Sequence, residues 1–223
     1  MVRSLNKHKL RHRQSERRGD STNPTATTIV RASSPRDFNA ARSILARQRE
    51  WLEGLLGGDL ATYQPSALRE MAELERFYEP PNGWLLVAMV GGEPAGIVGV
   101  HRRGPGVGEL KRMYVAPEAR GLGIGRALAE GAIEAACELG LDVLRLETHA
   151  GHMPVAVKIY RKLGFREIES YSDSFVAFDG LLTMELRLSG RRRAKSTGDD
   201  VVAAEEGRSR CNRSNNALLR NSA

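Results

Sequence analysis

Arg120-Gly121-Leu122-Gly123-Ile124-Gly125 carries the strongest structural signal in this 223-residue chain. It follows a predicted strand at residues 109–115, which Pro117 ends because proline has no N–H to donate to a sheet. It opens a predicted helix at 124–139, which Gly140 is placed to end. Free N–H groups at a helix start bind anions, and glycines let the backbone approach a phosphate closely. The stretch therefore predicts a phosphate-binding turn between a strand and a helix.

A glycine-rich turn alone leaves two other interpretations open. One is a tight strand-to-helix loop that binds nothing. The other is a dinucleotide-binding Rossmann domain, whose glycines lie in the first strand-to-helix turn of a parallel sheet. Here the turn follows at least three predicted strands, two of them paired as a hairpin, and the chain lacks the Gly-Lys-Ser/Thr of a P-loop. The order of the elements therefore disfavours a Rossmann domain.

The other predicted elements place the turn late in one mixed sheet. A helix begins at Ser34-Pro35 and is broken by Gly57-Gly58, and Gly91-Gly92 joins the hairpin. The remaining predicted elements are strands at 29–32, 84–90, 93–101, 143–148, 165–171 and 181–188, and helices at 67–77 and 154–163. This order predicts an α+β fold around one central sheet.

The basic charge of the chain lies in its two ends. The net charge is +7, yet residues 1–20 account for +5 and residues 189–223 for +4, which leaves −2 for 21–188. Residues 1–27 and 190–223 are predicted to be disordered basic tails around one domain at 28–189. A nucleic-acid-binding domain would carry its basic patch on the folded surface, so we expect no specific nucleic-acid partner.

Hydropathy and cysteine content bear on the compartment. No stretch approaches the roughly 18 consecutive apolar residues of a membrane span, and the first residues lead into charge rather than an apolar signal. The two cysteines, Cys137 and Cys211, are too few and too far apart to indicate a disulfide framework or a metal site. We therefore expect a cytoplasmic protein that needs no metal and contacts no membrane.

Three linked motifs resemble the GCN5-related N-acetyltransferase (GNAT) superfamily. They are Glu109-Leu110-Lys111-Arg112-Met113-Tyr114-Val115-Ala116-Pro117, the Arg-x-x-Gly-x-Gly turn, and Ile159-Tyr160-Arg161-Lys162-Leu163-Gly164-Phe165. The resemblance covers about residues 28–188 and neither tail. It implies an acetyl-CoA-dependent N-acetyltransferase with a strongly curved mixed sheet of about six or seven strands and about four helices. It also implies that the fourth and fifth strands splay apart.

The resemblance further implies that acetyl-CoA, as co-substrate, enters the wedge between strands 109–115 and 143–148. Backbone groups of Met113 and Val115 would pair with the pantetheine arm as a strand would. Arg120 can add a charge-assisted bond at the phosphate turn. The pyrophosphate would be held by the N–H groups of Gly121, Gly123, Gly125 and Arg126.

The resemblance also implies two catalytic residues. Direct transfer needs a neutral amine to attack the thioester and a proton for the departing thiolate. Tyr160 matches the family's general acid, because a phenol with a pKa near 10 can donate that proton. Glu109 stands where many relatives place a carboxylate that deprotonates the amine through water. The alternative for Tyr160 is a helix tyrosine that packs on the sheet. The alternatives for Glu109 are a solvated carboxylate at the end of the strand and a carboxylate that pairs with Lys111 or Arg112.

Several neighbouring residues modify this expectation. Met153 stands where relatives often carry an asparagine, so that contact with CoA is not expected. His149 and His152 flank the region and are alternative proton-transfer groups. Lys111 and Arg112 are predicted on opposite faces of their strand, where one of them could bind a carboxylate of the acceptor.

The acceptor is expected to be a primary amine of a small molecule or peptide. Its pocket is predicted from the first two helices, including Trp51 and Tyr63, and from residues 171–178. The competing hypothesis is a non-catalytic acyl-CoA sensor, or a protein-modifying module recruited through the basic tails. The presence of Tyr160 and Glu109 favours the enzyme. By analogy with dimeric relatives, a homodimer is an open alternative.

Overall fold

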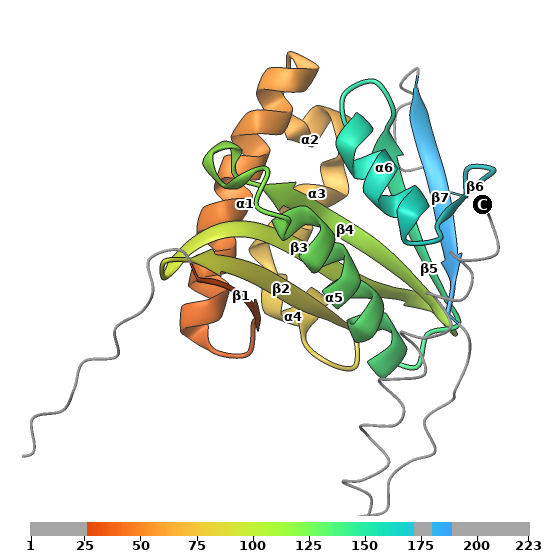
Figure 1. Cartoon of the computed structure of the whole chain (residues 1–223), viewed down its shortest axis with the longest axis horizontal. Coiled ribbons are helices and arrows are strands. Elements are labelled where there is room, and N and C mark those ends of the chain that lie inside the picture. Colours follow the sequence, from red (N-terminus) through yellow and green to blue (C-terminus); the bar gives the residue numbers. More distant parts are fainter. Residues whose placement is uncertain (1–25, 172–179, 189–223) are drawn as a thin grey trace, which may run out of the picture.

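Seven strands form one sheet in the computed structural model, which describes residues 26–171 and 180–188. Their order across the sheet is β1-β2-β3-β4-β5-β7-β6. Every neighbouring pair is antiparallel except β4 and β5, which are parallel (Figure 1). The strands are β1 Thr27–Arg31, β2 Gly83–Val90, β3 Glu93–Gly104, β4 Val107–Val115, β5 Val143–His149, β6 Arg166–Ile168 and β7 Leu181–Arg187. The predicted α+β class and the number of strands are confirmed.

Helices cover both faces of this sheet. They are α1 Pro35–Leu56, α2 Leu60–Tyr63, α3 Pro65–Ala72, α4 Leu74–Tyr78, α5 Ile124–Glu138 and α6 Pro154–Lys162, with a 3-10 turn at Pro117–Ala119. The described part of the chain thus has more helices than the four expected, because three of them are short. None of the described helices has the length and hydropathy to cross a bilayer. The two predicted tails lie almost wholly outside the described residues.

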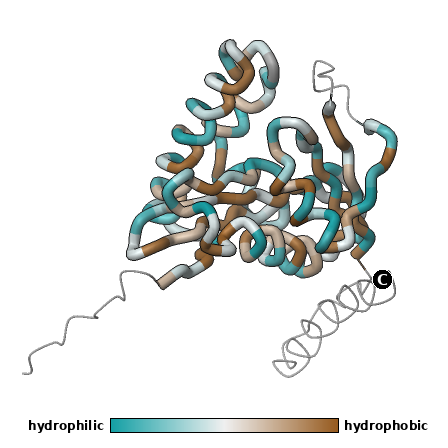
Figure 2. The backbone as a smooth tube through the Cα atoms, turned by 45° about the horizontal axis from the view of Figure 1, so that its top comes forward, coloured by the Kyte–Doolittle hydropathy of each residue, from teal (hydrophilic) through white to brown (hydrophobic). Residues whose placement is uncertain are grey.

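The core has two halves, one on each face of the sheet. Phe38 and Ile44 of α1 pack with Leu74 and Tyr78 of α4 against one face. The apolar face of α5, which includes Leu128, packs against the other face together with residues of α6. Figure 2 shows hydrophobic residues concentrated along the strands and alternating with hydrophilic residues along the helices. The sheet is therefore the middle of three layers.

Local sequence signals explain most element ends. The hydroxyl of Ser34 accepts a hydrogen bond from the N–H of Asp37, whose carboxylate accepts one from the N–H of Ser34, so α1 begins with a capping box. α1 ends at Gly57, whose φ of 69° lies in the left-handed region that glycine adopts without strain. These residues confirm the predicted start and end of the first helix.

Two predicted elements differ most from the structure. The helix expected at 67–77 is divided into α3 and α4 at Glu73, whose φ of −115° and ψ of 40° are not helical. This break lets α3 present Glu70 while α4 buries Leu74 and Tyr78 against the sheet. The strand expected at 165–171 is shorter, because β6 pairs with β7 only over Arg166–Ile168.

The parallel pair β4 and β5 separates along its length. Only three positions pair, from Val107 with Val143 to Glu109 with Arg145, although both strands continue for at least four more residues. α5 provides the crossover that a parallel pair requires. The splayed fourth and fifth strands that the family resemblance implied are therefore present.

A bulge in β4 lies within the splayed part. Ile97 of β3 pairs with Tyr114 and Gly99 pairs with Lys111, so β4 has one residue more than β3 in this interval. Arg112 has a φ of 57° and is the one non-glycine residue with positive φ in the described part of the chain. Such a conformation is uncommon and persists where surrounding contacts fix it.

The sheet packs closely against α4 at Gly99, so a substitution there can test this packing. A Cβ added there would lie 2.4 Å from Cε1 of Tyr78, whose side chain is fully buried. We expect Gly99→Ala to lower the free energy of unfolding by about 1–3 kcal/mol, because Tyr78 must move. Gly104→Ala, in the same strand with nothing within 4 Å of the added Cβ, is the control. Equal urea midpoints for the two variants would contradict this packing argument.

Candidate active site

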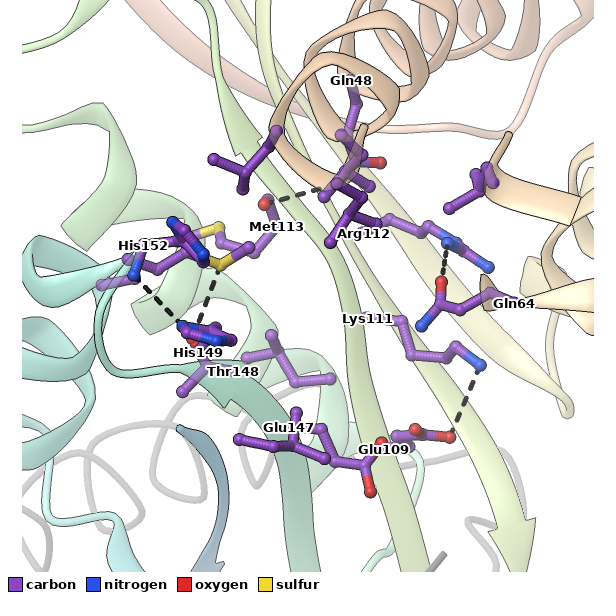
Figure 3. A pocket seen from close by; sticks show the side chains of 18 of the residues that line it. Gln48, Gln64, Glu109, Lys111, Arg112, Met113, Glu147, Thr148, His149 and His152 are labelled. Carbon is purple, nitrogen blue, oxygen red and sulfur yellow. Dashed lines mark hydrogen bonds and ion pairs between the residues drawn. The ribbon is translucent and has the colours of Figure 1, made fainter. Parts of the chain in front are cut away.

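A cavity of about 170 Å³ lies where β4 and β5 separate. The end of α1 and the start of α2 line one side, and β5 and α6 line the other (Figure 3). Glu109 and Tyr160 both line it, so the structure brings the two predicted catalytic residues to one cavity. Met113 and Trp51 line it too.

The phosphate turn has the geometry of an anion site. Gly121 and Gly123 have φ values of 85° and 78°, which direct the chain into α5 without a side-chain cap. Within the described residues, the N–H groups from Gly121 to Arg126 make no backbone hydrogen bond, and the first one formed is from Ala127 to Gly123. These unbonded donors at a helix N-terminus fit a pyrophosphate.

The two arginines of the turn are engaged by other groups in the structure. Nε of Arg120 donates to the carbonyl of Val115 at 3.1 Å, and its guanidinium lies 6.0 Å from the Trp51 ring centroid. Nε of Arg126 lies 2.8 Å from a carboxylate oxygen of Glu130 on the same helix. A direct role of either side chain toward phosphate stays a prediction.

Tyr160 occupies a buried position on α6. Its ring packs 5.6 Å from that of Phe165, and burial raises the pKa of its phenol. The phenol therefore stays protonated at neutral pH and above, as a proton donor must.

Glu109 lies in the last paired position of β4 and β5, at the apex of the wedge. It is 8% exposed, and its Oε2 is 3.5 Å from Nε of Arg103 and 3.7 Å from Nζ of Lys111. These contacts place a carboxylate at the cavity with cations at ion-pair distance on two sides.

A buried ionic network fixes the bulge of β4 against α3. Arg112 donates from Nε and Nη2 to the two carboxylate oxygens of Glu70, at 2.7 and 2.9 Å. Its Nη1 donates to Oε1 of Gln64 at 3.2 Å, and the hydroxyl of Tyr78 also donates to Glu70. Nζ of Lys111 lies 3.1 Å from Glu70. The network connects α3 and α4 to the strand that lines the cavity.

This network corrects the prediction that Lys111 and Arg112 point to opposite faces of their strand. The left-handed backbone of Arg112 interrupts the alternation of side chains, so both cations meet Glu70. Burial alone would raise the pKa of Glu70, but the hydrogen bonds and charge of Arg112, with Lys111, lower it to about 2.

The loop after β5 adds polar side chains to the cavity. The ring centroids of His149 and His152 lie 4.3 Å apart, and the N–H of His152 donates to Nδ1 of His149 at 3.2 Å. Thr148 donates its hydroxyl to Sδ of Met153 at 3.6 Å. All four residues line the cavity. Within the described ranges, no three His, Cys, Asp or Glu side chains gather as metal ligands.

Two residues were not predicted, namely Glu70 of the buried ionic network and Gln48 of the cavity lining. Gln48 is buried on the apolar face of α1 and its amide donates to the carbonyl of Met113 at 3.4 Å. A polar residue on an apolar helix face was the available signal. Of the predicted acceptor pocket, Trp51 lines the cavity, whereas the side chain of Tyr63 and residues 172–178 fall outside the described part of the chain.

Comparisons with known proteins agree with this geometry. The model of the acetyltransferase (GNAT) family matches residues 45–165. An uncharacterized N-acetyltransferase of Schizosaccharomyces pombe is 36% identical over 150 residues, which cover 66% of this chain and 88% of that protein. A mycothiol acetyltransferase of Pseudarthrobacter chlorophenolicus is 40% identical over 99 residues, which cover 42% of this chain and 30% of that protein.

A solved structure supports the fold. The crystal structure of an acetyltransferase of the GNAT family from Staphylococcus aureus Mu50 superposes with a TM-score of 0.59 at 21% identity. The match covers 73% of this chain and 99% of that one. At this identity the likeness concerns the fold alone.

The pKa of Glu70 gives a prediction on acid stability. Because it is about 2 in the folded protein against an ordinary 4.5, the carboxylate stabilises the fold above pH 4.5 and progressively less as the pH falls toward 2. We expect Glu70→Gln to lower the free energy of unfolding at pH 7 by about 3 kcal/mol, because Arg112 loses its counter-charge. The deficit should shrink on acidification.

The exposed Glu75, paired with Arg42 on the surface, provides the control. Glu75→Gln should cost about 0–1 kcal/mol. Urea unfolding between pH 2 and 7 measures both variants. A Glu70→Gln deficit that stays constant over this pH range would contradict the proposed cause.

Proposed function

The chain belongs to the GNAT acetyltransferase family, and on that premise we propose that it transfers the acetyl group of acetyl-CoA directly to a primary amine of a small molecule or peptide. One observation carries the proposal: the wedge between β4 and β5 opens into a cavity lined by both Glu109 and Tyr160. The start of α5, with its free N–H groups, supports it as the phosphate end of the same site.

The co-substrate would be held by backbone groups. The N–H groups of Gly121, Gly123, Gly125 and Arg126 suit its pyrophosphate. The edge of β4 at Met113 and Val115 suits the amides of its pantetheine arm, since β5 has separated from β4 there. In the structure the carbonyls of Met113 and Val115 accept hydrogen bonds from the side chains of Gln48 and Arg120. If the pantetheine amides donated to these carbonyls, their hydrogen bonds would replace those two side-chain bonds. Acetyl-CoA supplies a thioester whose thiolate is the leaving group.

Two side chains, Glu109 and Tyr160, would carry out the proton transfers of the reaction. The carboxylate of Glu109 accepts a proton from the ammonium of the acceptor, through water, so that the amine becomes neutral. The hydroxyl of Tyr160 donates its proton to the departing thiolate, and its burial keeps that proton in place at working pH. Apolar side chains such as Leu52, Leu55 and Ala156 line the cavity beside these two groups.

The test measures release of free thiol from acetyl-CoA with a panel of primary amines, together with the product mass. Turnover that adds one acetyl group to an amine supports the proposal. Tight CoA binding without turnover of any amine would overturn it in favour of an acyl-CoA sensor.

Tyr160→Phe removes the proposed proton donor and retains the ring. We expect kcat to fall about 10²–10³-fold with an unchanged Kd for CoA, because only the proton transfer is lost. Tyr114→Phe, another buried tyrosine but one outside the cavity lining, should keep kcat within about twofold. A Tyr160→Phe enzyme with wild-type kcat would remove Tyr160 from the mechanism.

Gly123→Ala tests the phosphate turn. Gly123 and Gly140 both have positive φ, at 78° and 68°, and an added Cβ meets nothing within 4 Å at either position. Both substitutions should therefore destabilise the fold by about 1 kcal/mol. Only Gly123→Ala should raise the KM for acetyl-CoA, by about tenfold, because it disturbs the N–H groups that face phosphate. Equal KM values for the two variants would argue against the turn as the CoA site.

A further inference from the structure

Two buried oxygen atoms at the cavity accept no hydrogen bond from the described residues, although one of them, Oε2 of Glu109, has longer ion-pair contacts with Arg103 and Lys111. The other atom is Oε1 of Gln48. Both residues line the cavity, one at the side of α1 and one at the apex of the wedge (Figure 3). Buried acceptors are nearly always satisfied, so a ligand that donates hydrogen bonds would complete this site.

The charged donors that line the cavity already face carboxylates of the protein. Arg112 gives two hydrogen bonds to Glu70, and Lys111 lies between Glu70 and Glu109 at 3.1 and 3.7 Å. Nε of Arg103 lies 3.5 Å from Glu109. A carboxylate on the acceptor would have to compete with these ion pairs for each Lys or Arg side chain that lines the cavity. The site is therefore poorly suited to an amino acid that must be held by its carboxylate.

An apolar wall lines the side of the cavity that is formed by α1 and α2. It consists of side chains from the last two turns of α1 and the first residue of α2, namely Trp51, Leu52, Leu55, Leu56 and Leu60. Leu52 and Leu55 are only partly buried and belong to neither core cluster of the described residues. The fold thus leaves apolar surface at the cavity that a ligand can cover.

We propose that the acceptor is a primary amine with an apolar substituent and without a carboxylate beside the amine, an inference that rests on the proposed acetyltransferase function. An ammonium has three N–H donors and no acceptor, which complements the buried oxygen of Glu109. The apolar substituent lies against Leu52 and Leu55. Gln48 accepts a further N–H near Met113, either from the amine or from an amide of the pantetheine arm.

The experiment compares matched acceptors by their kcat/KM. We expect 2-phenylethylamine to exceed phenylalanine, and 3-methylbutylamine to exceed both leucine and ethanolamine, each by about tenfold or more. Preference for the amino acids, or equal turnover of ethanolamine, would overturn the inference. Absence of thiol release with every amine would instead overturn the proposed function, so the two failures are distinguishable.

Substitutions at the apolar wall test whether it determines the preference for apolar acceptors. Leu55→Gln should lower kcat/KM for 3-methylbutylamine by about tenfold and leave the KM for acetyl-CoA unchanged. Leu68→Gln, an exposed leucine of α3 outside the cavity lining, is the control and should change neither value. Equal effects of the two variants would remove the apolar wall from the site.

Gln48→Met keeps the length of the side chain and removes both polar groups. A raised KM for the amine alone assigns the Gln48 oxygen to the acceptor, and a raised KM for acetyl-CoA alone assigns it to the pantetheine arm. Unchanged values for both would show that Gln48 binds neither substrate.

Discussion

The buried ion pair between Glu70 and Arg112 is the interaction on which the geometry of the active site depends. Two hydrogen bonds join a carboxylate and a guanidinium that are both almost fully buried, and breaking either partner would leave an uncompensated charge in the core. Arg112 is also the residue whose left-handed backbone forms the bulge of β4. The same contact therefore connects α3, whose Ser66 lines the cavity, to the bulged part of β4, which lines it too.

The separation of β4 from β5 then creates the site. Beyond Glu109 the facing edges of the two strands are no longer paired, and free strand edges need other partners. Gln48 and Arg120 supply some of them by bonding to the carbonyls of Met113 and Val115. These side-chain bonds are individually weak and replaceable, which suits an edge where an extended co-substrate is proposed to bind.

Much of the fold was predictable because its signals are local. The capping box at Ser34, the glycines at the hairpin and at the start of α5, and the apolar faces of the helices each act within a few residues. Tyr160 and Glu109 were predicted through motifs in a fixed order. The break at Glu73 was not, because the sequence of 67–77 continues a helical pattern and packing against the sheet divides it.

The sequence by itself determined the strand-turn-helix with its glycine-rich turn, the two flanking motifs, and the family to which they belong. Only the tertiary structure decided what the charged and polar residues around them do. Arg112 meets Glu70 across 42 residues and Gln48 meets Met113 across 65, so neither contact can be derived from local pattern. The additional residue in the bulge of β4 lets Lys111 and Arg112 both reach Glu70, although they were predicted on opposite faces of the strand. The alternation of side chains along a strand fails at a bulge.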